Sequence, residues 1–404
     1  MDALVFILEQ PYLYETIKAY DTFYKVVIIN KKSKADRQEL KNVFDEIIEV
    51  SNVHNKFETD KAISVIIAKR KVKAVYGSYE SVLEVAGRLR SKFNIPGMTE
   101  DETLKVRNKA LMKTVMKQNA IATADFKVVK TLTDHLKFLG TLNKPVVIKP
   151  VNGFATKYTY KIDGFQDLLK VKTLKAMFRH KTFLAESFVD GEEYHCDSVV
   201  LNGKVVFSSV AKYLNNCLST IDFKAPSGSI FYPATCDNDA IISRVKSLNE
   251  ATVKALNIQN AVCHMEAFID KQGCAIFGEI TPRIGGSPHM PECIKNIYGV
   301  DLHKAFVDLE IHNYKSQIKP KPLFTGWISF PSKQGIVTKI SNEADFFDVE
   351  GVVKVKIYNK IGDKISRRKN TTIRSGYIIM ENSDHDQLLK KLYDAYNRFQ
   401  LKVK

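Results

Sequence analysis

Residues 262–286 constrain the fold of this chain more than any other stretch. Two short apolar segments flank the polar turn Asp270–Gly273, a pattern typical of two strands joined in a β-hairpin. Side chains alternate along a strand with a period of two, so Glu266 and Glu279 are expected on one face, opposite or diagonal, if the turn is even in length. The sequence therefore predicts two converging carboxylates.

The two acids indicate a metal site beside an anion site. Glu266 and Glu279 each interrupt an apolar strand, and a buried carboxylate is costly unless it is paired or binds a metal. Carboxylate oxygens suit Mg²⁺, which is commonly shared with substrate phosphates. Arg283 follows Glu279 by four residues, and Gly285 and Gly286 leave backbone amides open to an anion. The alternative is a solvated edge hairpin with two incidental acids.

Composition excludes several classes of protein. The chain has 404 residues, 45% of them apolar, which indicates a globular protein with several domains. Six scattered cysteines without a Cys-x-x-Cys pair favour a reducing compartment, and we expect the cytoplasm. The first apolar run is too short for a signal peptide, and no segment is long enough to span a membrane. The net charge of +16 is spread along the chain without a basic tail, so nucleic-acid binding is not expected.

Residues 1–97 are expected to form an N-terminal α/β domain. Strand-like segments alternate with amphipathic segments, which predicts a parallel sheet. The predicted strands are Ala3–Leu8, Lys25–Asn30, Glu46–Val50 and Lys73–Tyr76, and the helical stretches lie near residues 11–22, 59–70 and 79–92. The turn after the first strand lacks a glycine fingerprint, so dinucleotide binding is not indicated. We expect this domain to bind something else or to be mainly structural.

Lys109 lies within a predicted helix. The helix begins after Thr99, which forms a capping box with Glu102, and it is expected to continue to about Asn119. Taken alone, this position indicates a solvated lysine. Elements predicted further along are strands Asp125–Lys130 and Tyr158–Ile162 and a helix near residues 132–140.

Lys149 ends the β-branched strand Pro145–Pro150. A lysine at the end of such a strand and ahead of a proline could meet a phosphate, and an ordinary edge-strand lysine is the alternative. The small-residue loop 151–157 follows, and its backbone amides could cover phosphates. An ordinary hairpin is equally compatible with that loop.

Glu186 and Glu193 flank an expected crossing between two subdomains, residues 98–187 and 188–318. A strand is predicted to end at Glu186, and Glu193 opens the next strand. An acid at such a place can accept hydrogen bonds from sugar hydroxyls, while the alternative is a plain turn acid.

The remaining sequence predicts a hairpin, helices and a β-rich end. Residues 194–213 read as two strands around the turn Asn202–Gly203, and residues 214–235 as a long irregular loop. A helix is predicted near residues 239–257 and a helix pair at 292–311, followed by a linker at Lys319–Pro322. Residues 319–404 are expected to form a β-rich C-terminal domain with strands Phe324–Phe330, Gly335–Ile340, Val352–Ile357 and Ser375–Met380 and a final helix, Asp384–Phe399.

Together these motifs resemble the ATP-grasp ligase superfamily over most of the chain. The order carries the resemblance: Asn108-Lys109-x-x-Met112, the strand with Lys149, the small-residue loop, Glu186-Ser187-Phe188-Val189-Asp190-Gly191-x-Glu193, His264-x-Glu266 and Glu279-Ile280-Thr281-Pro282-Arg283-Ile284-Gly285-Gly286. The implied fold has α/β and α+β parts: a parallel α/β domain, a two-lobed nucleotide-binding core and a β-rich cap. The cap is most similar to that of the L-amino acid ligases, which join two free amino acids.

The resemblance also implies roles for individual residues. Lys109 and Lys149 would contact the nucleotide, and Gly153, Phe154, Ala155 and Thr156 would close over its phosphates. Glu186, Ser187, Phe188 and Val189 would hold adenine, Glu193 would hold the ribose, and Lys212 is placed with the nucleotide-binding residues. Glu266, Glu279 and Thr281 would bind two Mg²⁺ ions, for which Mn²⁺ could substitute, although many members have asparagine in place of Thr281. Arg283 would stabilise charge in the transition state, and Gly285, Gly286 and His289 would contact substrate.

The implied reaction is ATP-dependent joining of a carboxylate to an amine. The carboxylate becomes an acyl phosphate because an amine cannot displace oxide, and amino acids are the expected substrates, giving a dipeptide, ADP and phosphate. Lys212, His289 and residues 214–235 are expected to border the substrate pocket. The alternatives are an ATP-grasp enzyme that uses bicarbonate and a non-catalytic nucleotide-binding protein, and a homodimer is left open. A carboxylase needs a biotin carrier, and the chain has no Ala-Met-Lys-Met-type segment.

Overall fold

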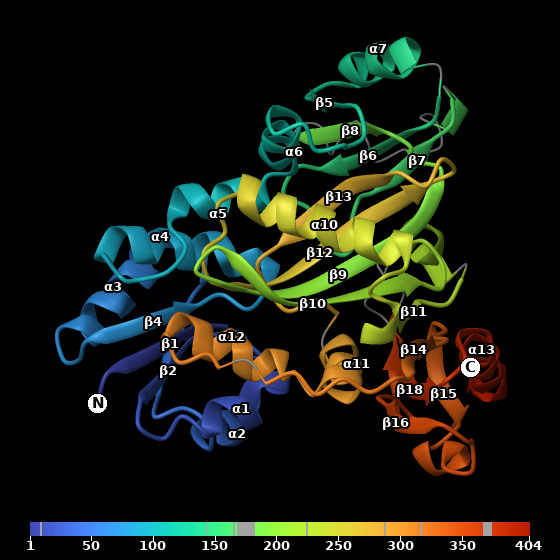
Figure 1. The fold of residues 1–404 in the computed structure, drawn as a ribbon. Helices are drawn as coiled ribbons and strands as arrows, with labels where there is room; N and C mark the ends of the chain where they lie inside the picture. The colour runs from blue at the N-terminus through green and yellow to red at the C-terminus, as the bar shows by residue number, and fades with distance from the viewer. Residues whose placement is uncertain are drawn as a thin grey trace.

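The structure is a computed structural model of the 404-residue chain. It describes all residues except 9, 143, 165, 168–181, 224, 287, 316 and 367–373. A long sheet crosses the centre of the molecule, a small lobe lies above it in Figure 1, and the N-terminal and C-terminal parts lie below it at opposite ends. Among the described residues, no helix is long and apolar enough to cross a membrane.

The N-terminal part is a parallel sheet, as predicted, and its four strands lie in the order β3-β2-β1-β4. Its strands are β1 (Ala3–Ile7), β2 (Tyr24–Asn30), β3 (Glu46–Val50) and β4 (Val72–Tyr76). Its helices are η1 (Pro11–Leu13), α1 (Tyr14–Lys18), α2 (Arg37–Lys41), α3 (Lys56–Ile67), η2 (Glu80–Val82) and α4 (Leu83–Phe93). Every residue of β1 is buried, as expected for a parallel strand covered on both faces. The strand order reverses between β1 and β4, and open α/β sheets commonly bind ligands at such a point.

The single helix predicted from Thr99 to Asn119 is wrong, because the chain breaks at Asn108. Thr99 and Glu102 form the predicted capping box of α5 (Glu100–Arg107), but Asn108 is extended, with φ −88° and ψ 104°. Its side chain accepts the backbone N–H groups of Ala110 and Leu111 and so caps a second helix, α6 (Lys109–Gln118). Lys109 therefore begins a helix instead of lying in the middle of one.

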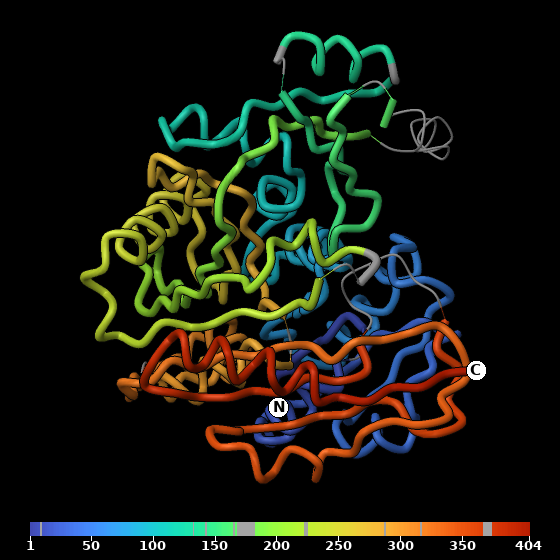
Figure 2. Tube along the Cα trace, turned by 90° about the vertical axis from the view of Figure 1, so that its right-hand side faces the viewer, coloured from blue at the N-terminus to red at the C-terminus, as the bar shows by residue number. Residues whose placement is uncertain are grey.

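The small lobe is a four-stranded antiparallel sheet in the order β5-β8-β6-β7. Its elements are β5 (Phe126–Val129), α7 (Leu132–Leu142), β6 (Val146–Pro150), β7 (Tyr160–Ile162) and β8 (Phe183–Ser187). Buried side chains including Val129, Ile148 and Phe183 form its own core. Figure 2 shows this lobe standing apart from the terminal regions, joined to the rest through α6 and the chain after β8.

The central sheet has eight strands in the order β13-β12-β9-β10-β11-β14-β18-β16. The six strands introduced here are β9 (Gly191–Leu201), β10 (Lys204–Tyr213), β11 (Gly228–Phe231), β12 (Ala261–Asp270), β13 (Ala275–Thr281) and β14 (Phe324–Phe330). The predicted turn between β9 and β10 is present, and Asn202 and Gly203 have the positive φ values it requires, 51° and 75°. The prediction of an irregular loop over 214–235 is wrong, because this segment contains β11 together with η3 (Cys217–Phe223) and η4 (Ala234–Cys236).

Strand β11 makes the sheet continuous into the C-terminal region. It pairs with β10 on one side and with β14 on the other, so the sheet crosses the boundary predicted at residue 319. The remaining C-terminal elements are β15 (Gly335–Ile340), η5 (Glu343–Phe346), β16 (Val352–Ile357), β17 (Lys364–Ile365), β18 (Gly376–Asn382), α13 (His385–Arg398) and β19 (Leu401–Val403). The predicted C-terminal strands and the final helix are thus present.

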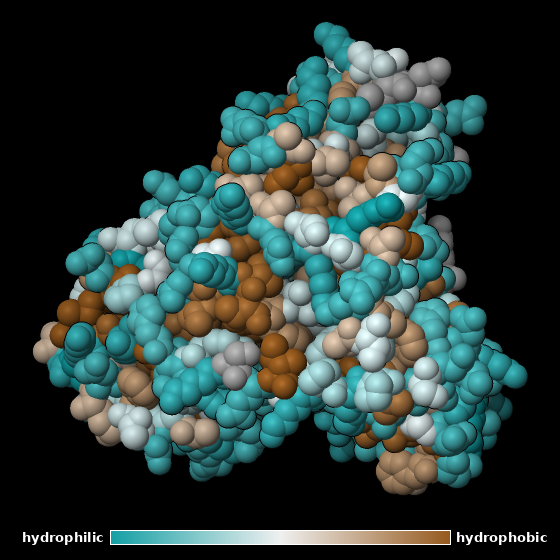
Figure 3. Space-filling model, viewed as in Figure 1, coloured by the Kyte–Doolittle hydropathy of each residue, from teal (hydrophilic) through white to brown (hydrophobic). Residues whose placement is uncertain are grey.

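Helices cover the two faces of the central sheet. Helix α10 (Ala240–Ala255) packs on the face that carries Tyr194, Cys196 and Met265. Helices α11 (His289–Tyr298) and α12 (Leu302–Glu310) pack with the N-terminal part on the other face. Figure 3 shows hydrophilic residues over most of the visible surface, with apolar residues gathered between the areas of α5 and α12.

Candidate functional site

Glu266 on β12 and Glu279 on β13 are directly paired across the hairpin, so the predicted convergence is present although the turn between Ile269 and Ala275 is odd in length. The register shifts between Glu266 and Ala267, and at this point the backbone of Gly278 passes so close to the Glu266 carbonyl that a side chain would overlap it. Both acids belong to the sheet face opposite α10. Their side chains keep 25% and 28% of their surface exposed, which leaves carboxylate oxygens open to a ligand.

These residues fit a divalent metal such as Mg²⁺. Thr281 lies two residues beyond Glu279 on the same face and pairs with His264 across the strands. Its hydroxyl is buried and has no hydrogen-bond partner among the residues that the structure describes. Two adjacent carboxylates and an unpaired hydroxyl supply hard oxygen donors, and an oxygen left without a partner in the interior is costly unless something binds it.

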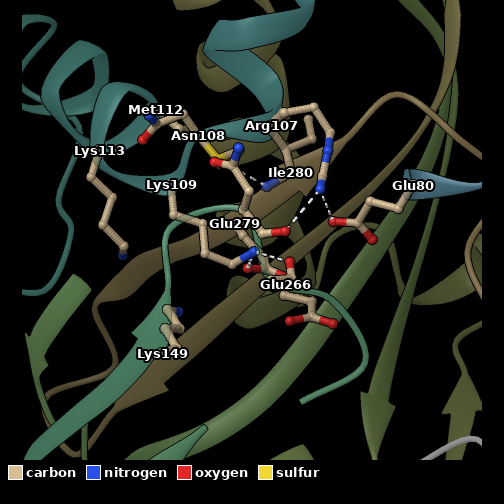
Figure 4. A network of polar contacts seen from close by, with 12 residues as sticks. Glu80, Arg107, Asn108, Lys109, Met112, Lys113, Lys149, Glu266, Glu279 and Ile280 are labelled. Carbon is tan, nitrogen blue, oxygen red and sulfur yellow. Dashed lines mark hydrogen bonds and ion pairs between the residues drawn. The ribbon is translucent and has the colours of Figure 1, made fainter. Parts of the chain in front are cut away.

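Two lysines converge on these acids from other elements (Figure 4). Lys109 Nζ lies 3.0 Å from Glu279 Oε2 and donates to the carbonyl of Gly153 at 2.8 Å. Figure 4 also shows Lys149 on β6. Lys149 pairs with Glu186 on β8 at 3.1 Å. Burial alone would raise the pKa of Glu279, but Lys109 and Lys149 outweigh burial and hold that pKa below its ordinary value. The site therefore combines the ionised carboxylate of Glu279 with the cations that a polyphosphate requires.

A third lysine, Lys113, was not singled out from the sequence. Its side chain is 1% exposed, lies 3.6 Å from Glu186 Oε1 and donates to the Thr123 hydroxyl at 2.9 Å. Burial lowers the pKa of Lys113 to about 8, although Glu186 opposes that shift. Its spacing of four residues from Lys109 on a helix was the signal that could have identified it, because residues at i and i+4 share a face.

The small-residue loop after β6 lies beside the lysines. Gly153 and Phe154 are followed by Ala155 and Thr156, whose φ values of 51° and 54° are unusual for residues with side chains. Arg107 donates to the carbonyl of Asn152 at 3.0 Å, which ties the loop to the end of α5. The loop is therefore held over the Lys109 side of the site.

Arg283 is held by an acid from the N-terminal part that was not expected. Both its Nε and Nη2 donate to Glu80 Oε2, at 3.2 and 2.7 Å. Glu80 begins η2, directly after β4, and its other oxygen pairs with Arg107 at 2.5 Å. Glu80 thus connects Arg283 to the helix before Lys109. No local pattern points to Glu80, since it lies 203 residues from Arg283 in the chain.

The segment that crosses from the small lobe to the central sheet is fixed by backbone contacts. Ser187 accepts the N–H of Asp125 through its hydroxyl at 3.1 Å, and Phe188 donates its own N–H to Pro145 at 2.9 Å. Glu186 points to the lysines, whereas Ser187 anchors the strand and Phe188 lies against Lys161. Val189 precedes β9 and leads the chain into the central sheet.

Glu193 and Lys212 lie on opposite faces of the central sheet. Glu193 is 4% exposed and accepts the N–H of Cys217 at 2.6 Å, and burial together with the nearby Glu266 raises its pKa. Lys212 pairs in register with Tyr194, so alternation turns it to the α10 face, where it contacts Glu192. The expectation that Lys212 binds nucleotide or borders the substrate pocket is therefore not supported by its position.

A buried polar chain runs beside Glu266. His264 Nδ1 lies 2.9 Å from Asp197 Oδ1, and His195 Nδ1 lies 2.7 Å from Asp197 Oδ2. His195 Nε2 is 3.1 Å from the hydroxyl of Ser229, which also accepts the indole N–H of Trp327 at 2.7 Å. These contacts leave no room for an ion between the histidines and Asp197, so we interpret the group as a hydrogen-bonded chain.

The protonation of this chain follows from its surroundings. The two histidines hold the pKa of Asp197 below its ordinary value despite burial, so both imidazoles donate to a carboxylate. Burial lowers the pKa of His195, which leaves its Nε2 as an acceptor for the Ser229 hydroxyl. Burial opposes the charge on His264, but Asp197 and Glu266 outweigh it and raise the pKa of His264 to about 10. His264 is thus an imidazolium between two carboxylates.

The expected substrate residues Gly285, Gly286 and His289 lie around this chain. A side chain at Gly285 would overlap His264 and Asp197, and Gly286 has a φ of 44°. His289 begins α11, and its ring centroid lies 3.8 Å from that of Trp327. A glycine is therefore required at position 285 because the loop passes directly over His264 and Asp197. This packing reason holds independently of any contact between Gly285 and substrate.

Two parts of the chain match known protein families. Residues 142–290 match the ATP-grasp domain, and residues 327–404 match the L-amino acid ligase C-terminal domain 2. The first range contains Lys149, Glu266 and Glu279, and the second contains most of the C-terminal sheet. Residues 142–290 thus correspond to an ATP-grasp domain, and the fold of the whole chain is that of ATP-grasp proteins.

The chain also resembles the L-amino acid ligases in sequence and fold. It is 24% identical over 326 residues to the L-arginine-specific L-amino acid ligase of Bacillus subtilis, covering 79% of this chain and 78% of that relative. Its fold is similar to the L-amino acid ligase from Bacillus licheniformis, with a TM-score of 0.84, 19% identity and coverage of 100% and 99%. It is also similar to phosphoribosylglycinamide synthetase from Anaerococcus prevotii, with a TM-score of 0.72, 19% identity and full coverage of both chains.

Proposed function

We propose that this protein activates the carboxylate of one amino acid with ATP and joins it to the amine of a second, forming a dipeptide with release of ADP and phosphate. The observation that carries the proposal is the pairing of Glu266 with Glu279 beside Lys109 and Lys149, in a chain that ends in an L-amino acid ligase domain. Such a site combines donors for a metal–phosphate complex with cations for the phosphates themselves.

The reaction has two steps, phosphoryl transfer to the carboxylate and attack of the amine on the acyl phosphate. In the first, a carboxylate oxygen of the acid substrate bonds to the γ-phosphorus of ATP while the bond to ADP breaks. In the second, the amine nitrogen bonds to the acyl carbon, the carbon–oxygen bond to phosphate breaks, and the amine loses a proton. Phosphate leaves with the oxygen that came from the carboxylate. Positioning and charge neutralisation supply most of the acceleration in phosphoryl transfer.

The chain's own residues supply that positioning. Glu266 and Glu279, with Thr281 beside them, would hold Mg²⁺, which neutralises phosphate charge when it is bound. Lys109 and Lys149 would pair with the nucleotide, and the loop containing Gly153 would cover its phosphates. Glu186 and Glu193 would hold the base and ribose at the two ends of the crossing segment.

Arg283 would stabilise the negative charge that develops on the acyl phosphate and on the oxyanion of the tetrahedral intermediate. Its guanidinium is oriented by Glu80 and lies in the segment after Glu279, which brings a fixed planar cation next to the carboxylates. An oriented cation costs no reorganisation when the oxyanion forms. Arg283 is therefore the residue we assign to the transition state.

A screen of amino acid pairs tests the proposal. Purified protein with Mg²⁺ and ATP is given single amino acids and all pairs, and released phosphate and product mass are measured. Arginine is included among the amino acids tested because the relative from Bacillus subtilis is named arginine-specific. We expect phosphate release that needs two amino acids and a product of the mass of the joined pair. Bicarbonate as the acid tests the alternative chemistry, and release with bicarbonate alone would favour it.

A further inference from the structure

We infer that Trp327, Ser229 and His195 are positioning residues for the carboxylate of Glu266, acting through Asp197 and His264. The inference rests on the proposed role of Glu266 as a metal ligand. It makes the C-terminal region part of the machinery that orients the metal site, although Trp327 itself lies four strands away from β12 in the central sheet.

The chain of contacts is continuous and buried. From Trp327 Nε1 it passes to Ser229 at 2.7 Å, to His195 at 3.1 Å, to Asp197 at 2.7 Å and to His264 at 2.9 Å. His264 Nε2 then lies 3.7 Å from Glu266 Oε1. Trp327 is 2% exposed and the side chain of His264 7%, so bulk water competes little with these contacts.

The direction of the hydrogen bonds is fixed from the tryptophan end. An indole N–H can only donate, so the Ser229 hydroxyl accepts from Trp327 and turns its own proton toward His195. His195 then carries its proton on Nδ1 and donates to Asp197. With one Asp197 oxygen engaged by His195, the other faces His264. The orientation of the His264 ring is thereby set from a distant strand.

Strand β10, which lies between His195 on β9 and Ser229 on β11, carries a small residue where the hydrogen-bonded chain crosses it. On β10, Ala211 pairs with His195 on one side and with Phe231 on the other. Its methyl group leaves His195 free to reach Ser229 on β11, across β10. On the far side Gly285 allows the loop after β13 to pass directly over His264 and Asp197. The hydrogen-bonded chain from Trp327 to His264 explains why both residues are small. Packing alone would not require a small residue at either position.

The consequence for Glu266 is orientation. Hydrogen-bonded partners behind a metal ligand fix its geometry, and their loss commonly lowers metal affinity about 10- to 100-fold. Because Trp327 acts through four intermediate groups, we expect the lower end of that range. Trp327 is the only tryptophan of the chain, so its fluorescence reports directly on this environment.

Two variants and one control test the inference. Trp327→Phe removes the donor and keeps an aromatic ring, and Ser229→Ala interrupts the chain one step further on. Tyr298→Phe is the matched control, because Tyr298 is also buried and donates to the Tyr232 carbonyl at 2.6 Å outside the chain. Mn²⁺ binding in the presence of ADP is followed by the EPR signal of the free ion against a protein-free ADP blank. ADP binding without metal and thermal unfolding are measured on the same samples.

We expect Mn²⁺ affinity to fall by about tenfold in Trp327→Phe and in Ser229→Ala, with metal-free ADP affinity unchanged and Tyr298→Phe like the wild type. The double variant should lose no more than either single variant, because both interrupt one chain. Equal Mn²⁺ affinity in folded variants, or additive losses, would overturn the inference. Absence of Mn²⁺ binding in the wild type would instead count against the proposed function. If Trp327→Phe fails to fold, the Mn²⁺ affinity of Ser229→Ala alone tests the inference.

Discussion

Lys109 Nζ lies 3.0 Å from Glu279 Oε2, so the cation proposed for nucleotide phosphate is paired with the carboxylate proposed for metal. The same ammonium donates to the carbonyl of Gly153 in the loop over the site. The strong charges of the site thus neutralise one another in this arrangement. Binding of a metal–nucleotide complex must replace this pair with two others, Lys109 with phosphate and Glu279 with metal.

Glu279→Gln should abolish turnover without unfolding the protein. The amide cannot supply the anionic oxygen that the metal requires. We expect activity to fall by at least about 100-fold, which is more than the loss expected when a residue that only orients a metal ligand is removed. The variant leaves the buried Lys109 ammonium without its ion-pair partner, so the unfolding temperature should fall while the protein stays folded. Product formation at a range of Mg²⁺ concentrations and thermal unfolding check this, and ordinary activity in a folded variant would remove Glu279 from the metal site.

Lys149→Ala should raise the ATP concentration needed for half-maximal rate, because Lys149 supplies a cation next to Glu186 and Glu279. Lys212→Ala is the matched control, since Lys212 faces the α10 side of the sheet and contacts Glu192. The ATP requirement should change strongly in the first variant and little in the second. An equal change in both, or a change only in the amino acid requirement, would contradict the placement of Lys149.

Arg283→Lys should still bind ATP but form product slowly. Lysine keeps the charge and loses the planar fork that donates twice to Glu80, so an interaction made as charge develops is weakened. We expect single-turnover phosphate release to fall by roughly 10²-fold, similar to the loss of an oxyanion donor. Parallel loss of ATP affinity would identify Arg283 as a nucleotide-binding residue instead.

Stability should depend on pH through Lys113. Burial lowers its pKa to about 8 in the folded state, against an ordinary value of 10.5, while Glu186 and Glu279 favour its charge and Lys149 opposes it. Between these values the unfolded chain binds more protons, so the contribution of Lys113 to stability rises with pH. Relative to Lys113→Met, the wild type should gain up to about 1.4 kcal/mol per pH unit between pH 8 and 10. A constant difference in denaturant unfolding would contradict this.

The sequence predicted features that local periodicity controls. The cap at Thr99 followed from its spacing to Glu102. The convergence of Glu266 and Glu279 was predicted for a turn of even length, but the turn is odd, and the register shift next to Glu266 is what places Glu279 opposite it. The break at Asn108 was missed because an asparagine that caps a new helix is locally compatible with continuing the first one. Strand β11 was missed because four residues carry too little periodicity to separate a strand from a loop.

Contacts between distant elements could not be predicted in the same way. The pair Arg283–Glu80 joins the segment after β13 to the N-terminal part, and the chain from Trp327 to His264 combines four strands. Nothing in the residues around Glu80 or Ser229 distinguishes them from ordinary surface positions. The face on which Lys212 lies could not be predicted, because the register of β10 depends on its pairing with β9.

The central claim is that the acid substrate becomes an acyl phosphate, and the fate of its oxygen tests this most directly. An amino acid labelled with ¹⁸O in both carboxylate oxygens is supplied with ATP, Mg²⁺ and the amine partner found in the screen, and the phosphate is analysed by mass spectrometry. We predict one ¹⁸O atom in each phosphate released and one retained in the product. Unlabelled phosphate, or label found in AMP, would show that the carboxylate is not activated by the γ-phosphoryl group.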